Sequence, residues 1–255
     1  MGFSGAIGDR GFNTAAGTMG SAGVARSPSG KMQGRTGVPG NGLLLWVMVK
    51  PSMGGSATYQ TSAGLVSVLR DWSGERNHLK QSTAANRPAI VGGKALDFTG
   101  GPYLVGDSAT AFDVIGTGEF EVWAVLRLPS LVAGLQVMIG TVARVAGLGF
   151  QLLAHAGKFR GRLADGDGNK AIVTGATQNN GFRMVRFRRT SANKLALSVR
   201  TSGVNDTPTQ VTGATFNASG GALSIGAANG GSPAATVKIA EVLVYKRGLS
   251  SGQAT

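Results

Sequence analysis

Residues 65–100 read LVSVLRDWSGERNHLKQSTAANRPAIVGGKALDFTG, and their order of apolar and turn-forming residues is the most informative feature of the sequence. A short apolar run, residues 65–69, is followed by a group of turn-forming residues. These are Asp71, Ser73, Gly74 and Asn77. Pro88 then restricts Arg87 to extended geometry, and Ala95–Phe98 begins another strand-like run. The stretch is therefore predicted to be a loop-rich part of an all-β fold.

The same pattern continues over the rest of the chain from Leu43 onward. Short apolar runs alternate with Gly, Asn, Ser or Pro, and no stretch has a sustained helical period. The predicted strands are Leu43–Val49, Ala95–Phe98, Phe120–Leu128, Gln136–Val142, Leu148–Ala154, Lys158–Leu163, Phe182–Arg188, Lys194–Arg200, Ala222–Gly226 and Val237–Tyr245. The short spacings between them are typical of antiparallel hairpins and argue against βαβ units. We predict a two-sheet antiparallel sandwich over residues 43–255.

Two phrases of the sequence resemble the laminin G-like, concanavalin A-like family. The first combines a D-x-S-G-x-x-N-H phrase, an Arg-Pro pair and a strand that ends near a glycine. Its residues are Asp71, Ser73, Gly74, Asn77, His78, Arg87, Pro88, Asp97, Phe98 and Gly100. The second is the family's closing phrase, Ile239–Tyr245 followed by Arg247, Leu249 and Ser250. The resemblance implies a jelly-roll sandwich but no single function, since such domains serve as lectins, adhesion modules, glycosidase accessories and viral structural parts.

Residues 1–42 differ in composition from everything after them. They hold 12 glycines, four basic residues and one acidic residue, with no apolar periodicity. Such a segment cannot bury enough apolar surface to fold alone. We therefore predict an extended Gly-rich basic arm that becomes ordered only on assembly with a partner.

Several common stabilising and targeting features are absent from the sequence. There is no cysteine, so neither disulfides nor thiolate metal sites can stabilise the fold. The first residues lack the continuous apolar stretch of a secretory signal. The longest strongly apolar run, Leu43–Val49, is too short to span a membrane. No membrane partner is expected.

The net charge of +13 is unevenly distributed. Between residues 158 and 200, ten basic residues stand against two acidic ones, a net +8. We predict a basic partner surface on these neighbouring strands. Its candidate residues are Lys158, Arg160, Arg162, Arg183, Arg186, Arg188 and Arg189. The partner would be an acidic protein surface, an anionic polysaccharide or nucleic acid, and the alternative is a solvated face that keeps the protein soluble.

Alternation along Phe120–Leu128 indicates a candidate glycan-binding set. It places Glu121, Trp123 and Arg127 on the face opposite the apolar residues of that strand. An aromatic face accommodates the C–H side of a sugar ring, and its charged neighbours would hydrogen-bond the hydroxyls. The alternative is a tryptophan covered by a neighbouring loop or subunit. Glu119 shares this face, but the further acidic residues of a glucanase E-x-D-x-E strand are absent, so we predict no enzymatic activity.

The segment Asp165–Asn169, DGDGN, has two interpretations. Asp165, Asp167 and Asn169 offer the alternating oxygen ligands that calcium prefers. The same residues suit a hairpin turn between strands Lys158–Leu163 and Lys170–Thr174. We favour the turn, so no cofactor is predicted, with calcium as the alternative.

The combination of a Gly-rich arm, a cysteine-free sandwich and no catalytic set resembles a bacteriophage virion protein, such as a head decoration protein, head fibre or similar external appendage. The resemblance implies that residues 1–42 dock on other virion proteins, the coat protein foremost. It also implies that the sandwich lies on the external surface of the virion, where many copies give multivalent adhesion to cell-surface glycans. A homo-oligomer is expected, with a trimer as the guess. Open alternatives are a free carbohydrate-binding module, a glycoside hydrolase and a nucleic-acid-binding protein.

Overall fold

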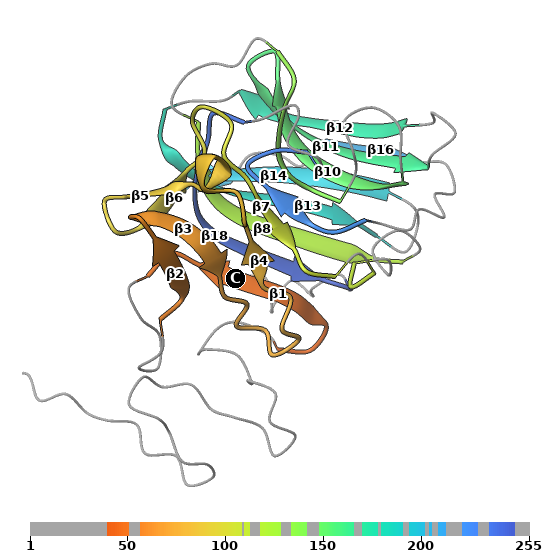
Figure 1. Ribbon diagram of the computed structural model, residues 1–255. Coiled ribbons are helices and arrows are strands. Elements are labelled where there is room, and N and C mark those ends of the chain that lie inside the picture. The colour runs from red at the N-terminus through yellow and green to blue at the C-terminus, as the bar shows by residue number, and fades with distance from the viewer. Residues whose placement is uncertain are drawn as a thin grey trace, which may run out of the picture.

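The structure is a computed structural model of the 255-residue chain (Figure 1). It describes residues 40–50, 57–108, 110–112, 118–128, 134–141, 148–165, 170–177, 180–190, 194–201, 204–205, 209–212, 221–228 and 235–247. The predicted arm, residues 1–42, lies outside these ranges except for its last three residues, so it stays a prediction. The described residues contain no helix of the length and apolarity that crossing a membrane requires.

Strands make up most of the described chain. They are β1 (Leu43–Met48), β2 (Tyr59–Ser62), β3 (Leu65–Leu69), β4 (Leu79–Lys80), β5 (Ala89–Val91), β6 (Ala95–Asp97), β7 (Leu104–Gly106), β8 (Phe120–Arg127), β9 (Gln136–Gly140), β10 (Leu148–His155), β11 (Lys158–Asp165), β12 (Lys170–Thr177), β13 (Phe182–Arg189), β14 (Lys194–Thr201), β15 (Val204–Asn205), β16 (Thr209–Thr212), β17 (Ser224–Ile225) and β18 (Lys238–Tyr245). One short 3₁₀ helix, η1 (Ala84–Asn86), lies between β4 and β5. The pairings within the described ranges are antiparallel. The predicted all-β class is confirmed.

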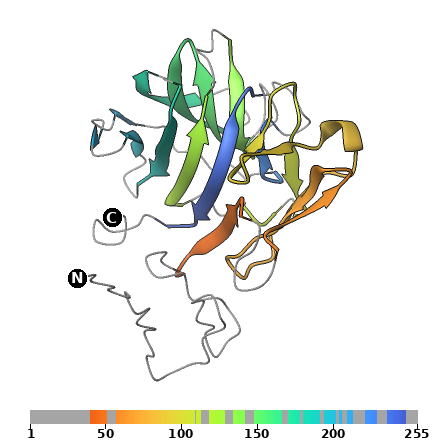
Figure 2. The ribbon, with the colours of Figure 1, turned by 90° about the vertical axis from the view of Figure 1, so that its left-hand side faces the viewer.

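The strands form two layers that pack face to face (Figures 1 and 2). One layer has the order β1, β18, β8, β13, β14, β16. The other has the order β12, β11, β10, β9, β17, β7, β4, β3. Across the core, Phe120 and Phe187 of the first layer meet Phe150 of the second, with ring centroids 5.5 and 6.5 Å apart. This packing confirms the predicted antiparallel sandwich.

All ten strands predicted from the sequence are present, although β17 is shorter than the predicted Ala222–Gly226. The predicted alternation on β8 also holds, because its apolar face lies in the main core. The core residues of this strand are Phe120, Val122, Ala124 and Leu126. Sequence reasoning missed β2, β4, β5, β7, β15 and β16, which have two to four residues each and are too short to show alternation.

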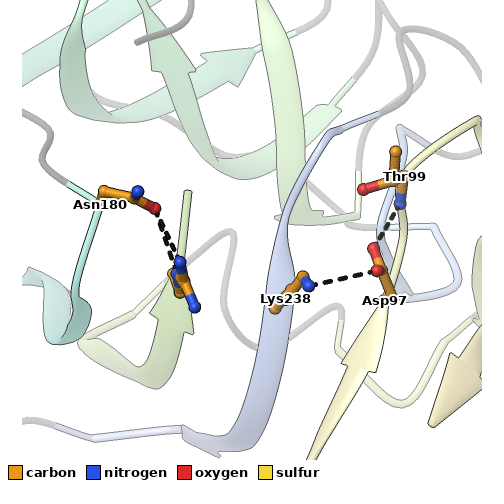
Figure 3. Close-up of polar contacts among 5 residues, drawn as sticks. Asp97, Thr99, Asn180 and Lys238 are labelled. Carbon is orange, nitrogen blue, oxygen red and sulfur yellow. Dashed lines mark hydrogen bonds and ion pairs between the residues drawn. The ribbon is translucent and has the colours of Figure 1, made fainter. Parts of the chain in front are cut away.

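A charged pair ties β18 to the neighbouring strand β6 (Figure 3). Lys238 lies opposite Asp97 in the strand register, with Nζ 3.5 Å from Oδ2. The backbone N–H of Thr99 donates to Asp97 Oδ1 at 2.9 Å. Partial burial alone would raise the pKa of Asp97, but the hydrogen bonds from Thr99 and the charge of Lys238 outweigh it and hold the pKa below its usual range.

The pair predicts a pH-dependent contribution to stability. A carboxyl whose pKa is lowered on folding stabilises the fold above its unfolded-state pKa, and this contribution is lost as the pH falls through the folded-state pKa. Asp97→Asn should lower the free energy of unfolding at neutral pH by about 0.5–1 kcal/mol. In urea titrations the difference from the wild type should shrink in acid. A difference that is equally large in acid would contradict this assignment.

Candidate binding cleft

An open cleft of about 440 Å³ lies against strands β2, β3 and β4. Figures 1 and 2 show these short strands at one side of the sandwich, away from β12. Gln60, Val68 and Lys80 lie side by side in the register of the three strands and line the cleft. Leu69 and Leu79, which neighbour Val68 and Lys80 in the sequence, face the core. The cleft therefore occupies the outer face of this part of the sheet.

The remaining lining residues come from the loop that joins β3 to β4. They are Arg70, Asp71, Trp72 and His78. Arg70 follows Val68 by two residues, and its backbone N–H donates to the carbonyl of Thr58 at 2.8 Å. Strand-like pairing thus continues past β3, and alternation turns the Arg70 side chain to the same outer face as Val68.

Asp71 fixes the conformation of this loop through hydrogen bonds to the loop itself and to β1. Its Oδ1 accepts the backbone N–H groups of Trp46 at 2.9 Å and Ser73 at 2.8 Å. Its Oδ2 accepts the Ser73 hydroxyl at 2.7 Å and the backbone N–H of Asn77 at 2.8 Å. The carboxylate is only 9% exposed, so these four bonds form in a largely water-free setting. Their acceptor atoms are consequently occupied by the protein itself.

Further bonds fasten the loop to the edge of β1. The Asn77 side-chain amide donates to the carbonyl of Leu44 at 2.8 Å. The backbone N–H of Trp72 donates to the carbonyl of Trp46 at 2.7 Å. Asp71, Ser73 and Asn77 of the D-x-S-G-x-x-N-H phrase therefore bond to β1, whereas His78, its last position, lines the cleft. Trp72, at a variable position of that phrase, also lines the cleft.

The cleft presents hydrogen-bond donors beside an aromatic ring. His78 Nδ1 accepts the backbone N–H of Asp71 at 3.0 Å, so the ring proton lies on Nε2, the other nitrogen. Lys80 Nζ lies 2.5 Å from Asp107 Oδ2. Nε1 of Trp72 is buried, so the accessible part of its indole is carbon. Guanidinium, imidazole and amide groups around an indole suit an oxygen-rich ligand with an apolar C–H face.

The predicted glycan set lies on the other layer, on the outer face of β8. Glu121 is fully buried and forms an ion pair with Arg186. Trp123 is 8% exposed, and the guanidinium carbons of Arg186 and Arg200 lie 4.8 and 5.7 Å from its ring centroid. Both arginines come from strands that follow β8 in the layer. The three predicted residues share a face as alternation required, but the indole is largely covered, and its glycan role stays a prediction.

Arg127, the third member of that set, has a protein partner. Its Nε and Nη2 donate to Asn180 Oδ1 at 3.2 and 3.0 Å. Figure 3 shows the Asn180 side chain in this position. Asn180 precedes β13, so the contact joins β8 to the loop before its neighbouring strand. The arginine therefore has a role in the fold whether or not it binds a ligand.

The structure does not gather the predicted basic surface on one face. Lys158, Arg160 and Arg162 lie on the outer face of β11, because Gly161 between them packs against the ring of Phe187. A Cβ at Gly161 would lie 2.2 Å from that ring, which belongs to the opposite layer. Arg186 and Arg188 lie on the outer face of β13, opposite Trp123 and Glu121 of β8. Arg183 and Arg189 alternate with them, on the face of the core residues Val185 and Phe187. Residues on the outer faces of two packed sheets point in opposite directions, and the role of these residues as a partner surface stays a prediction.

The calcium prediction falls mostly outside the described residues. Asp165 ends β11, and Asp167 and Asn169 lie beyond the described ranges. Strands β11 and β12 on either side pair antiparallel, as the hairpin interpretation predicted. Within the described part of the chain, no group of three His, Asp or Glu side chains is arranged to bind a metal ion.

Sequence reasoning missed the cleft, although a signal for it was present. Because Asp71 and Ser73 of the D-x-S-G-x-x-N-H phrase turn inward, the variable position between them faces outward. Trp72 occupies this position, and Arg70 and Lys80 flank the motif on either side. An aromatic residue between two cations, next to an inward-facing motif, indicates a surface site.

The chain has the fold of several solved binding domains. The binding domain of Paraclostridial Mosquitocidal Protein 1 is 10% identical, with a TM-score of 0.60 over 84% of this chain and 51% of that chain. The ligand binding domain of botulinum neurotoxin serotype D, in complex with N-acetylneuraminic acid, is 10% identical with a TM-score of 0.59 over 84% and 50%. The chain thus spans about half the length of these structures. A Trypanosoma rangeli sialidase is 19% identical, with a TM-score of 0.55 over 92% of this chain and 35% of that chain.

These similarities establish the fold alone, because the identities are low. No protein-family model matches the chain, and no curated protein matches it.

Proposed function

We propose that this chain is a non-catalytic, lectin-like glycan-binding domain of a bacteriophage virion structural protein. The binding part is supported by the cleft, which Trp72 lines together with Arg70, His78 and Gln60. Trp72 also packs against the apolar cluster that contains Trp46 and Trp123. The lining residues provide an apolar surface for the C–H face of a sugar and donors for its oxygens. Further support comes from a structural neighbour that was solved with N-acetylneuraminic acid.

The surroundings of the candidate carboxylates support the proposal that the domain is non-catalytic. Glu121 is fully buried against Arg186, so a substrate cannot reach it without opening the sheet face. In the cleft, Asp71 accepts four hydrogen bonds and is held as a structural carboxylate. Retaining or inverting hydrolysis needs two accessible carboxyl groups on either side of the scissile bond. Release of sugar from any glycan by the purified protein would overturn this part.

The virion part of the proposal rests on the composition of residues 1–42. A Gly-rich basic segment that cannot fold alone suits an anchor to the coat protein or another virion protein, with the sandwich on the external surface. Many copies on one particle, or a homo-oligomer, would turn weak glycan affinity into firm adhesion. Deletion of residues 1–42 should abolish incorporation into particles and leave the sandwich folded. Full occupancy of particles by the deleted protein would contradict the anchor.

Trp72→Ala should weaken glycan binding at least about tenfold, because the variant loses the aromatic surface of the cleft. The comparison variant is Trp123→Phe, which alters an indole of the apolar cluster that Trp72 packs against but does not line the cleft, and it should leave affinity unchanged. Glycan arrays followed by titration calorimetry measure both, and thermal unfolding checks that both variants fold. Loss of binding in Trp123→Phe with full binding in Trp72→Ala would move the site to the outer face of β8.

A further inference from the structure

We infer that the cleft selects sugars that carry a carboxylate, and that Arg70 binds this group. The inference rests on the proposed function and specifies the substrate class of the same site. Its starting point is the charge balance of the cleft. Arg70, Lys80 and Asp71 are the lining residues that carry a full charge at neutral pH.

Two of these three charges are already matched by the protein. Lys80 forms an ion pair with Asp107, and the carboxylate balances the positive charge of the ammonium group. Asp71 directs both carboxylate oxygens at donors in its own loop and on β1. Its charge is thereby stabilised without a cation.

Arg70 is left as the cation that a ligand can engage. Within the described part of the chain, no hydrogen bond or ion pair joins its guanidinium to another side chain. The side chain is partly buried, so the field of its charge is less screened than that of a fully exposed arginine. A guanidinium presents its N–H donors in a planar fork that matches the two oxygens of a carboxylate.

The geometry around Arg70 favours a sugar acid over other anions. Arg70 follows β3, two residues after Val68, and His78 precedes β4, two residues before Lys80, so both flank the row of Gln60, Val68 and Lys80. The His78 Nε2–H and the Gln60 amide are available for ring hydroxyls, and the indole of Trp72 for the C–H face. One free guanidinium beside the negative charge of Asp71 suits a monoanion better than a doubly charged phosphate. A carboxylate on a sugar ring meets all of these conditions.

The test uses the full chain and pairs of probes that differ only in charge. Oligosaccharides that end in N-acetylneuraminic acid or glucuronic acid are titrated beside the same oligosaccharides with the carboxylate converted to its methyl ester. A galactose 6-sulfate probe distinguishes a sulfate from a carboxylate. The wild type should bind an acid at least about tenfold more tightly than its ester and than the sulfated sugar, because charge-assisted bidentate bonds are the strong ones.

Arg70→Gln should abolish the preference for the acid while the weak affinity for the ester remains. Arg70→Lys should retain part of it, because an ammonium keeps the charge but loses the fork. The matched control is Arg76→Gln, an exposed arginine of the same loop that does not line the cleft. Equal affinity for acid and ester, with both lost in Trp72→Ala, would overturn the inference and leave the proposed function standing. If the protein bound none of the probes and no glycan on an array, both the inference and the proposed function would be overturned.

Discussion

Asp71→Asn is expected to lower the free energy of unfolding by about 2–4 kcal/mol, because it leaves buried donors without acceptors. The Asp71 carboxylate accepts two hydrogen bonds on each oxygen and is 9% exposed. An amide has one oxygen, so its NH₂ group must face donors on the other side. Whichever way the amide turns, two bonds to the loop or to β1 are lost.

The measurement is chemical denaturation of the variant beside a matched control. Asp107→Asn removes a charge from a neighbouring exposed pair and should cost less than about 1 kcal/mol. Ser73→Ala, which removes a single donor to Asp71, should fall between the two. A loss in Asp71→Asn no greater than in Asp107→Asn would show that the loop is not held in this way.

Gly226→Ala is expected to lower the free energy of unfolding by about 3 kcal/mol, because two penalties coincide at this position. Gly226 follows β17 with φ +87°, a conformation that residues with a side chain rarely adopt. Its Cβ would also lie 2.1 Å from Cδ1 of Phe98, which is fully buried in the main core. The ring would have to move within a packed interior.

A second glycine separates the two penalties. Gly64 has φ +77°, but an added Cβ there meets no atom within 4 Å. Gly64→Ala should therefore show the backbone penalty alone, about 1–2 kcal/mol. Thermal and urea unfolding of the two variants give the packing contribution by difference. Equal losses in the two variants would mean that Phe98 does not press on Gly226.

The regular strands could be predicted from the sequence because they are long enough to alternate. On β8, every second residue from Phe120 to Leu126 lies in the main core, and the opposite face carries Glu121 and Trp123. Strands β2 and β4 have four and two residues, and only their register with β3 makes them a sheet. Such pairing depends on residues that are distant in sequence, which no local pattern reports.

The surroundings of individual side chains were less predictable than the strands. Trp123 faces away from the core as predicted, but Arg186 from the paired strand β13 lies directly opposite it and covers the ring. Lys158, Arg160 and Arg162 share one face of β11, yet β11 and the arginine-bearing strand β13 belong to different layers. Alternation of apolar and polar residues predicts the face of the strand on which each side chain lies. The layer in which the strand lies depends on the topology of the whole sheet.

The most direct test of the binding cleft is an NMR titration of the tryptophan indole N–H signals with an oligosaccharide that the protein binds. The chain has three tryptophans, Trp46, Trp72 and Trp123, so three signals report on three positions of the fold. Trp72→Phe and Trp123→Phe assign them. We expect the sugar to shift the Trp72 signal most, with smaller shifts for Trp46 and Trp123, which belong to the apolar cluster that Trp72 packs against. A shift of the Trp123 signal with the Trp72 signal unchanged would contradict this expectation and assign the site to the outer face of β8.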